Sequence, residues 1–288
     1  MLERMVTKDT TPVLATDPRF APRPSVSIVD AGKWTPDAPP AVSVIMPCLN
    51  EARTVEMSLV ETSRVLGEAF GERFEVVAVD DGSTDGTWKV AENVASRIPQ
   101  VRVVRLHNNG GKGHALRTTF EQSHGDIIGF LDGDFDIHPK QLQSLLRRLE
   151  TEHADVVVGS KRHPDSRIDY PRQRRILSRG YEWLVRALFG LRIRDTQAGI
   201  KVFRREVLER VLPMGLVKRY AFDAELLILV HRLGYRIAEA PIELESWDRI
   251  GSNINLREVV RMLKDTLGVF YRLYVTHYYD RPREPAAS

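Results

Sequence analysis

Three aspartates stand at alternate positions in the segment DGDFD, where an apolar run ends: Asp132, Asp134 and Asp136. On an extended chain alternate side chains point the same way, so Asp132 and Asp134 are expected to converge, with Asp136 joining them. Their oxygens suit a hard cation such as Mg²⁺ or Mn²⁺, which offsets the mutual repulsion of the carboxylates. The pattern also fits a solvated turn, because Asp and Gly are common turn residues.

Two further polar segments follow apolar runs. In VVAVDDGSTDGT, Asp80 and Asp81 could accept hydrogen bonds from a nucleobase or a ribose hydroxyl, while residues 83–85 could cap the helix that follows. In NNGGKGHALR, glycines precede an expected helix, where backbone N–H groups can approach an anion. The P-loop spacing is absent, and Lys112 is expected either to contact a nucleotide or to face solvent.

Strands and helices alternate in the first half of the chain. Helices are expected at residues 51–69 and 139–151, among others, and the strands are AVSVIMP, FEVVAV, VRVVRL, DIIGFL and ADVVVGS. This alternation predicts an α/β fold with a mostly parallel central sheet and helices on both faces. Ligands of such sheets bind beyond the carboxyl ends of the strands, so the polar segments at those ends are expected to form one site.

The second half contains a different series of elements. We expect a basic amphipathic helix at 172–190, then a strand and helix within 195–212, a buried helix at 221–235 and a strand at 236–246. A final amphipathic helix is expected at about 255–279, with charged residues on one face and apolar residues on the other. The charged residues are Arg261, Lys264, Asp265 and Arg272, and the apolar ones are Leu263, Leu267, Phe270 and Tyr274.

Composition indicates an ordinary globular protein. Of its 288 residues, 42% are hydrophobic and 28% are charged, and residues 1–40 contain seven prolines and are expected to form an irregular leader. The only cysteine is Cys48, which rules out an internal disulfide and favours a reducing, cytoplasmic location. We find no signal-peptide pattern, no apolar run long enough to span a membrane, and no metalloprotease, hydrolase or Rossmann motif.

A basic tract runs from Lys161 to Arg205, with thirteen Lys or Arg against four Asp or Glu. Such a tract predicts a phosphorylated substrate, another polyanion or an anionic membrane surface, or simply a solvated basic face. A nucleic-acid module needs aromatic residues interleaved with polar residues that reach the bases, whereas this tract consists mainly of arginine, so nucleic acid is not expected as a partner. The guanidinium and ammonium groups expected near the sheet edge suit phosphate oxygens, and they are Lys161, Arg162, Arg174 and Arg175.

The motifs taken together resemble the inverting GT-A glycosyltransferases of family 2, in particular the branch that uses polyprenyl phosphates. The segments that carry the resemblance lie within residues 41–256 and are VSVIMPCLNE, VVAVDDGSTDGT, NNGGKGHALRTTF, LDGDFDIHP and DTQAGIKVFRREVLE. The resemblance implies a nucleotide-binding α/β sheet and a nucleotide-sugar donor bound with Mg²⁺ or Mn²⁺. DTQAGIK and YAFDAELL are more similar to dolichyl-phosphate glucosyltransferases than to dolichol-phosphate mannose synthases, so UDP-glucose is favoured over GDP-mannose.

Roles for individual residues follow from this resemblance. Metal ligands are Asp132 and Asp134, with Asp136 where mannose synthases place a glutamine that also reaches the metal. Nucleotide-sugar contacts are Pro47, Asn50, Glu51, Asp80, Asp81, Lys112, Asp132 and Gly133. The acceptor phosphate is assigned to Arg162, Arg174 and Ser178, and catalytic roles fall to Asp134, Lys161, Arg175, Asp223, Glu225 and Arg249.

Two departures from the family pattern affect these roles. The family commonly has G-S-K where this chain has Gly251, Ser252 and Asn253, so Arg249 is expected to replace the missing lysine. Many bacterial relatives also carry C-terminal membrane-spanning helices, which this chain lacks. Its amphipathic end, residues 257–288, is expected either to lie on a membrane surface, as a peripheral contact, or to pack on its own domain.

The expected activity is inverting transfer of a hexose from a nucleotide sugar to a polyprenyl or dolichyl phosphate. An ionised phosphate needs no strong base, whereas a hydroxyl acceptor requires a carboxylate to take its proton, for which Asp223 and Glu225 are the candidates. A family 2 enzyme with a hydroxyl acceptor is therefore the alternative. A non-catalytic module that binds a nucleotide sugar or a membrane surface is an alternative of another class.

Overall fold

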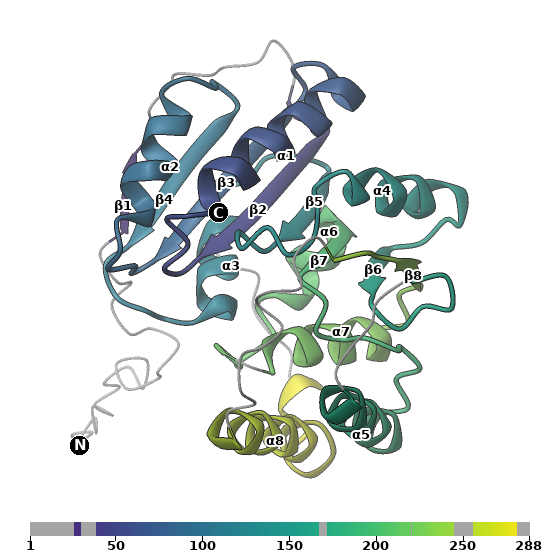
Figure 1. The fold of residues 1–288 in the computed structure, drawn as a ribbon. Helices are drawn as coiled ribbons and strands as arrows, with labels where there is room; N and C mark the ends of the chain where they lie inside the picture. The colour runs from purple at the N-terminus through teal and green to yellow at the C-terminus, as the bar shows by residue number, and fades with distance from the viewer. Residues whose placement is uncertain (1–25, 30–38, 167–171, 220, 245–255, 281–288) are drawn as a thin grey trace, which may run out of the picture.

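The computed structural model describes residues 26–29, 39–166, 172–219, 221–244 and 256–280. Its strands form one eight-stranded sheet in the order β1-β4-β3-β2-β5-β7-β6-β8 (Figure 1). Their bounds are β1 Val26–Val29, β2 Val42–Cys48, β3 Phe74–Asp81, β4 Val101–Leu106, β5 Ile127–Leu131, β6 Val156–Ser160, β7 Ile200–Arg204 and β8 Ile237–Pro241.

The sheet is mostly parallel, as predicted. Strands β4, β3, β2 and β5 pair in parallel, and β6 and β8 run in the same direction beyond the intervening strand β7. Only β1 and β7 run the other way. The five polar segments singled out in the sequence therefore follow strands whose carboxyl ends lie at one edge of the sheet.

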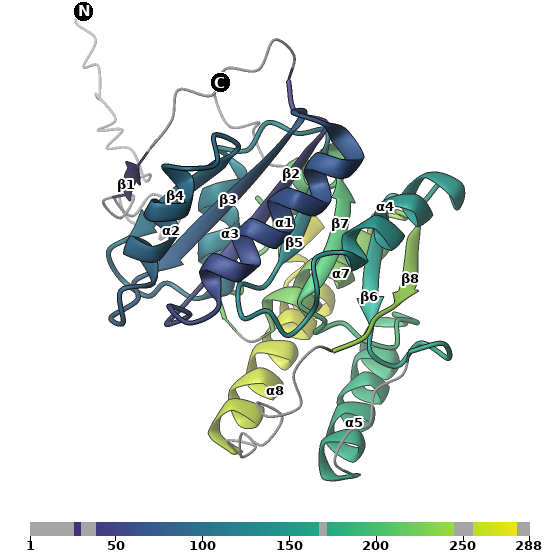
Figure 2. The ribbon, with the colours of Figure 1, turned by 45° about the horizontal axis from the view of Figure 1, so that its top comes forward.

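Helices cover both faces of the sheet, and their bounds are α1 Val55–Phe70, α2 Thr87–Ala95, α3 Lys112–Phe120, α4 Gln141–Thr151, α5 Arg172–Phe189, α6 Arg205–Val211, α7 Phe222–Arg232 and α8 Leu256–Phe270. Helices α1, α2 and α4 pack on one face of the sheet and form one hydrophobic core with it. Helices α3, α5, α6, α7 and α8 pack on the opposite face and form a second core (Figures 1 and 2). Strand residues alternate between the two cores, as Val44 and Ile45 do in β2, because successive side chains on a strand point to opposite faces.

Three local predictions differ from the structure. The expected irregular leader contributes β1, which pairs antiparallel with β4. Helix α1 begins at Val55 rather than at residue 51, because Glu51 to Thr54 form a hydrogen-bonded turn before it. Pro47 lies inside β2 instead of ending it. The pairing of β2 with β5 ends before Pro47, so its missing N–H removes no hydrogen bond between these two strands.

The final helix divides its residues differently from the predicted faces. After α8 the chain continues as a π-helix, η4 Tyr271–Val275, in which the N–H of Thr276 donates to the carbonyl of Tyr271, and then as a short 3-10 helix, η5 Tyr278–Asp280. Arg272 lies within this π-helix, and its side chain points inward to the buried Glu225 and not with the exposed charges. Leu267 and Tyr274 are exposed, and the buried stripe is Thr266, Val269 and Leu273.

Within the described residues, no helix has the length and apolar character needed to cross a membrane.

Candidate active site

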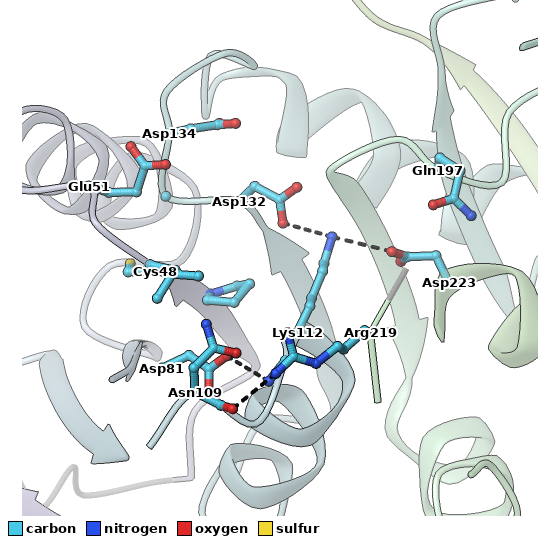
Figure 3. A pocket seen from close by; sticks show the side chains of 14 residues that line it. Cys48, Glu51, Asp81, Asn109, Lys112, Asp132, Asp134, Gln197, Arg219 and Asp223 are labelled. Atoms are coloured by element: carbon cyan, nitrogen blue, oxygen red, sulfur yellow. Dashed lines mark hydrogen bonds and ion pairs between the residues drawn. The ribbon is translucent and has the colours of Figure 1, made fainter. Parts of the chain in front are cut away.

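A cavity of about 420 Å³ opens at the carboxyl ends of β2, β3 and β5 (Figure 3). It gathers eight residues that the sequence singled out, namely Pro47, Glu51, Asp81, Lys112, Asp132, Gly133, Asp134 and Asp223. Residues far apart in the chain meet here because parallel strands end at the same edge. Six further residues complete the lining, and they are Cys48, Leu49, Asn109, Gly111, Gln197 and Arg219.

The acidic segment leaves β5 as a turn and not as the extended chain that we expected. Phe135 has a φ of 60°, and the backbone N–H of Asp136 donates to Oδ1 of Asp134 at 3.0 Å. This turn brings Asp132 and Asp134 to the cavity but leaves Asp136 outside its lining. The expected convergence by alternation on a strand is therefore wrong, although two of its three carboxylates do meet.

The two carboxylates form a centre of negative charge that fits a hard cation. Burial, and then the charge of Asp132, raises the pKa of Asp134 to about 6; the backbone N–H of Asp136 opposes this rise, and the charges of Asp136 and Glu51 add to it. Within the described residues, no three His, Cys, Asp or Glu side chains are grouped for a metal ion. Two carboxylates completed by substrate phosphates and water are the ligand set typical of Mg²⁺.

Two lysines neutralise the other side of the cavity. Lys112 Nζ lies 2.8 Å from Asp132 Oδ1 and 3.4 Å from Asp223 Oδ2, while the buried Lys201 Nζ lies 2.7 Å from Asp223 Oδ1. Burial opposes the charge of Asp223, but the two ammonium groups outweigh it and hold its pKa below the ordinary value. A carboxylate paired with two ammonium groups is a poor proton acceptor, so the geometry does not support Asp223 as a general base.

The glycine loop before α3 is held by Asp81. Both carboxylate oxygens accept N–H bonds, from Gly110 and from Gly111, each at 2.8 Å. Gly111 has a φ of 90°, and a Cβ there would lie 2.5 Å from the carbonyl oxygen of Lys218, so only glycine fits this close approach. Asp81 thus shapes the glycine loop, occupies the N–H groups of Gly110 and Gly111, and also lines the cavity.

Asp80, the other predicted base-binding acid, lies beneath the cavity. It is 2% exposed and accepts a bond from the N–H of Ser83 at 3.3 Å. Its Oδ2 has no hydrogen-bond partner among the described residues and lies 3.9 Å from Arg105 Nε. Burial accordingly raises the pKa of Asp80.

The loop after β2 packs against the acidic turn and the loop after β3. The N–H of Gly133 donates to the carbonyl of Pro47 at 3.3 Å, and a Cβ on Gly133 would lie 2.6 Å from Cys48 Sγ. Asn50 stands outside the cavity lining and joins two loops, since its Oδ1 accepts the N–H of Thr84 at 2.9 Å. The N–H of Glu51 donates to Thr87 Oγ1 at 2.8 Å, which places Glu51 at the cavity.

Arg162 and Ser178, two of the three predicted acceptor-phosphate residues, do not line this cavity. Arg162 forms an ion pair with Glu182 of α5, the N–H of Lys161 donates to Asp195 Oδ2 at 3.2 Å, and Ser178 is exposed on α5. Arg174 and Arg175 belong to α5, but their side chains, like all of Arg249, lie outside the described part of the chain.

Glu225 is also absent from the lining, which corrects its prediction as a proton acceptor. Its side chain is 1% exposed and is held by two backbone N–H groups, Leu216 and Val217, and by Tyr279. Its oxygens are thus bound to groups outside the cavity, and the geometry does not support Glu225 as a general base.

Three polar lining residues were missed as site residues. Asn109 and Gln197 belong to the motifs NNGGKG and DTQAGIK, which the sequence analysis identified without giving either residue a role. Arg219 stands before the buried helix α7 and carries no motif, yet it lines the cavity and its Nη2 donates to the carbonyl of Asn109 at 3.3 Å (Figure 3). It adds a cation on the side of the glycine loop.

Known proteins resemble the chain in sequence. The family model described as glycosyl transferase family 2 matches residues 43–212. Glycosyltransferase AglD of Haloferax volcanii is 33% identical over 246 residues, which cover 84% of this chain but only 38% of AglD. The dolichyl-phosphate beta-glucosyltransferase of Saccharomyces cerevisiae is 32% identical over 245 residues, covering 78% of this chain and 72% of that protein.

Solved structures resemble it in fold. Glucosyl-3-phosphoglycerate synthase from Mycobacterium tuberculosis, in complex with Mn²⁺, UDP-glucose and phosphoglyceric acid, has a TM-score of 0.61 at 22% identity and covers 88% of each chain. Mannosyl-3-phosphoglycerate synthase from Rubrobacter xylanophilus has a TM-score of 0.63 at 21% identity, covering 86% of this chain and 78% of that one. These likenesses confirm the predicted GT-A fold. The family model over residues 43–212 and the 32% identity with the yeast relative show that the chain belongs to glycosyl transferase family 2.

Proposed function

We propose that the protein transfers glucose from UDP-glucose to a polyprenyl or dolichyl phosphate, with inversion at the anomeric carbon. The observation that carries this proposal is that one cavity holds both the carboxylates of Asp132 and Asp134 and the cations Lys112 and Arg219. Acidic and basic groups so placed suit a diphosphate with its metal ion. The donor and acceptor are those that fit the name of the yeast relative, a dolichyl-phosphate beta-glucosyltransferase.

Asp132 and Asp134 would hold a divalent ion, Mg²⁺ or Mn²⁺. The ion supplies charge neutralisation for the diphosphate and so makes it a better leaving group. The choice of oxygen ligands supports a hard cation, and a structural neighbour was crystallised with Mn²⁺ and UDP-glucose.

The chain's own residues account for the remaining chemistry. Lys112 and Arg219 stabilise negative charge that grows on the diphosphate as it leaves. An ionised phosphate oxygen of the acceptor attacks the anomeric carbon from the face opposite the nucleotide. The new carbon–oxygen bond forms as the bond to the diphosphate breaks, and its electron pair leaves with UDP. No proton is transferred, which agrees with an Asp223 that is paired with two lysines.

The predicted acceptor residues keep a place in this proposal. Arg162, Arg174 and Ser178 would seat the acceptor phosphate, while Lys161, Arg175 and Arg249 keep the catalytic roles that the resemblance implies. For Arg162 this requires exchange of its present partner, Glu182, for the phosphate.

The donor and acceptor can be tested in one experiment. Incubation with a polyprenyl phosphate, Mg²⁺ and either UDP-glucose or GDP-mannose should give lipid-linked hexose from UDP-glucose at a rate at least about tenfold higher than from GDP-mannose. Product is measured by mass spectrometry of the organic phase. Faster transfer from GDP-mannose would overturn the sugar, and donor binding without any transfer would favour the non-catalytic alternative.

An exposed apolar strip supports peripheral contact with a membrane, where such an acceptor resides. The strip consists of Trp183 on α5 and of Val260, Leu267, Tyr271, Tyr274 and Val275 on α8 and η4. Helices α5 and α8 lie together at one end of the molecule, joined by the ring contacts of Phe189 with Phe270 and Tyr274 (Figures 1 and 2). Trp, Tyr and Leu beside cationic side chains are typical of helices that lie in a bilayer interface.

Charge on the same helices complements an anionic membrane. Of the described residues on α5 and α8, every exposed charged side chain is cationic, and these are Arg179, Arg186, Arg257, Arg261 and Lys264. Each contributes about 1 kcal/mol of attraction close to an anionic bilayer surface. We therefore assign this end of the molecule to the membrane.

Replacing Leu267 by Glu should weaken binding to phosphatidylglycerol vesicles by about tenfold or more, because an exposed leucine that enters a bilayer contributes about 1.5–3 kcal/mol. Co-sedimentation at fixed ionic strength measures the partition coefficient. Met57→Glu on α1 is the matched control, since Met57 is similarly exposed on the other side of the sheet and should bind as the wild type does. If vesicle binding weakened equally in both variants, or in neither variant, the result would contradict the assignment.

A further inference from the structure

A buried carboxylate lies between the C-terminal segment and the cavity without lining the cavity. Glu225, in α7, is 1% exposed, and its Oε2 accepts the N–H groups of Leu216 at 2.8 Å and Val217 at 2.7 Å. Two consecutive backbone amides bound to one oxygen fix the start of loop 216–219. A charged acceptor makes such bonds stronger than neutral ones.

The other oxygen of Glu225 is held by the end of the chain. Oε1 accepts the hydroxyl of Tyr279 at 2.5 Å and Arg272 Nη2 at 3.3 Å. Arg272 Nε also donates to the Tyr279 hydroxyl at 2.8 Å, so the two residues form a closed triangle with the carboxylate. Tyr279 is buried, and its hydroxyl is the shortest link between η5 and α7.

Loop 216–219 continues directly to the cavity. Arg219 lines the cavity. The carbonyl oxygen of Lys218 packs against Gly111, since it would lie only 2.5 Å from a Cβ at that position. Arg219 also donates to the carbonyl of Asn109 at 3.3 Å. A displacement of the loop at Leu216 would therefore move both Arg219 and the backbone against which the glycine loop packs.

Arg117 provides a second link from the same carboxylate. It lies in α3, the helix that begins with Lys112, and its Nη2 is 3.5 Å from Glu225 Oε2. Its Nη1 donates to the carbonyl of Val217 at 2.9 Å, so it binds the carboxylate and the loop at once.

We propose that Glu225 is a positioning residue, and that through it Tyr279 and Arg272 of the C-terminal segment set Arg219 for the donor diphosphate. This inference rests on the proposed function for its ligand, a nucleoside diphosphate. The segment that carries the exposed apolar strip thus also carries the residues that hold the donor site in shape. Binding of the diphosphate and the position of η4 and η5 are coupled, because one carboxylate serves both.

Tyr279→Phe tests the coupling by removing a single hydroxyl. We expect the dissociation constant for UDP with Mg²⁺, measured by calorimetry, to rise about fivefold or more. At saturating donor, kcat should also fall, because a displaced Arg219 stabilises less of the charge that grows on the leaving diphosphate. Tyr235→Phe is the control, since Tyr235 adjoins the end of α7 but makes no hydrogen bond through its hydroxyl in the described structure, and it should leave UDP affinity unchanged.

A double-mutant cycle separates positioning from general loosening. If Tyr279 acts through Arg219, Tyr279→Phe should weaken UDP binding no further in an Arg219→Ala background. Hydrogen exchange of the Leu216 and Val217 amides should be faster in Tyr279→Phe than in the wild type, with far-UV circular dichroism unchanged. Equal exchange in both proteins, or an effect on UDP that persists in full without Arg219, would overturn the inference. A wild type that binds no UDP would instead overturn the proposed donor, while the exchange comparison would still decide the coupling.

Discussion

Asp134→Asn is expected to lower kcat for hexose transfer by about 100-fold to 1000-fold, the usual effect of removing one group that stabilises charge in a transition state. The substitution keeps the shape of the side chain but removes the negative charge that would bind the divalent ion. Asp134 is the cleaner choice of the two carboxylates, because Asp132 also pairs with Lys112. Initial rates at several Mg²⁺ and Mn²⁺ concentrations measure the effect.

Asp136→Asn provides the matched control for this prediction. It makes the same change of charge two residues away, at a side chain outside the cavity lining, and its backbone N–H still donates to Asp134. We expect a loss of less than about fivefold, typical of a residue that acts only through a neighbour's position. Wild-type turnover by Asp134→Asn would end the metal assignment, and an equal loss in both variants would make Asp136 a third ligand.

Asp223→Ala is expected to produce the largest loss of stability, about 3–5 kcal/mol in the free energy of unfolding. The change leaves Lys201, which is 1% exposed, as a buried cation without its carboxylate, and leaves Lys112 with Asp132 alone. Urea denaturation measures the loss. Glu56→Ala is the control, because the pair of Glu56 with Arg97 is about half exposed and screened by water.

Removing both members of the buried pair sharpens the test. Asp223→Ala with Lys201→Met should be more stable than Asp223→Ala alone, since the uncompensated charge is then gone.

The stabilising effect of Asp223 depends on pH, and the direction of this dependence follows from its lowered pKa. The folded-state pKa of Asp223 lies below its ordinary value of about 3.9, so its contribution is complete above about pH 5 and declines as the pH falls through the folded-state value. If urea denaturation found Asp223→Ala as stable as the wild type, the result would contradict the ion-pair account.

The sequence was sufficient to predict the layout of the site because that layout depends on local pattern. β-branched runs ended by Gly, Asp or Asn fix where each strand stops, and parallel strands bring their ends to one edge. This is why Asp81, Lys112 and Asp132 meet in the cavity although they come from three different loops.

The predictions that failed, or that were missed, concern residues whose side-chain orientation depends on contacts with distant parts of the chain. Helix α7 is buried all round from Phe222 to Val230, so no apolar stripe indicates that Glu225 turns away from the cavity toward loop 216–219. Arg272 lies within the π-helix η4, which a period of 3.6 does not anticipate. Arg219 reaches the cavity only because the glycine loop, about a hundred residues earlier in the chain, packs beneath it.

The acceptor is the central claim, and one competition measures it. Wild-type protein is incubated with UDP-glucose, Mg²⁺, a polyprenyl phosphate in vesicles and 3-phosphoglyceric acid, the ligand crystallised with its structural neighbour. Both products are quantified, and the anomeric configuration of the sugar is determined by NMR. We predict glucosyl phosphate lipid with inverted, β configuration as the main product. Glucosylation of 3-phosphoglyceric acid without lipid product would contradict the account and establish a hydroxyl acceptor.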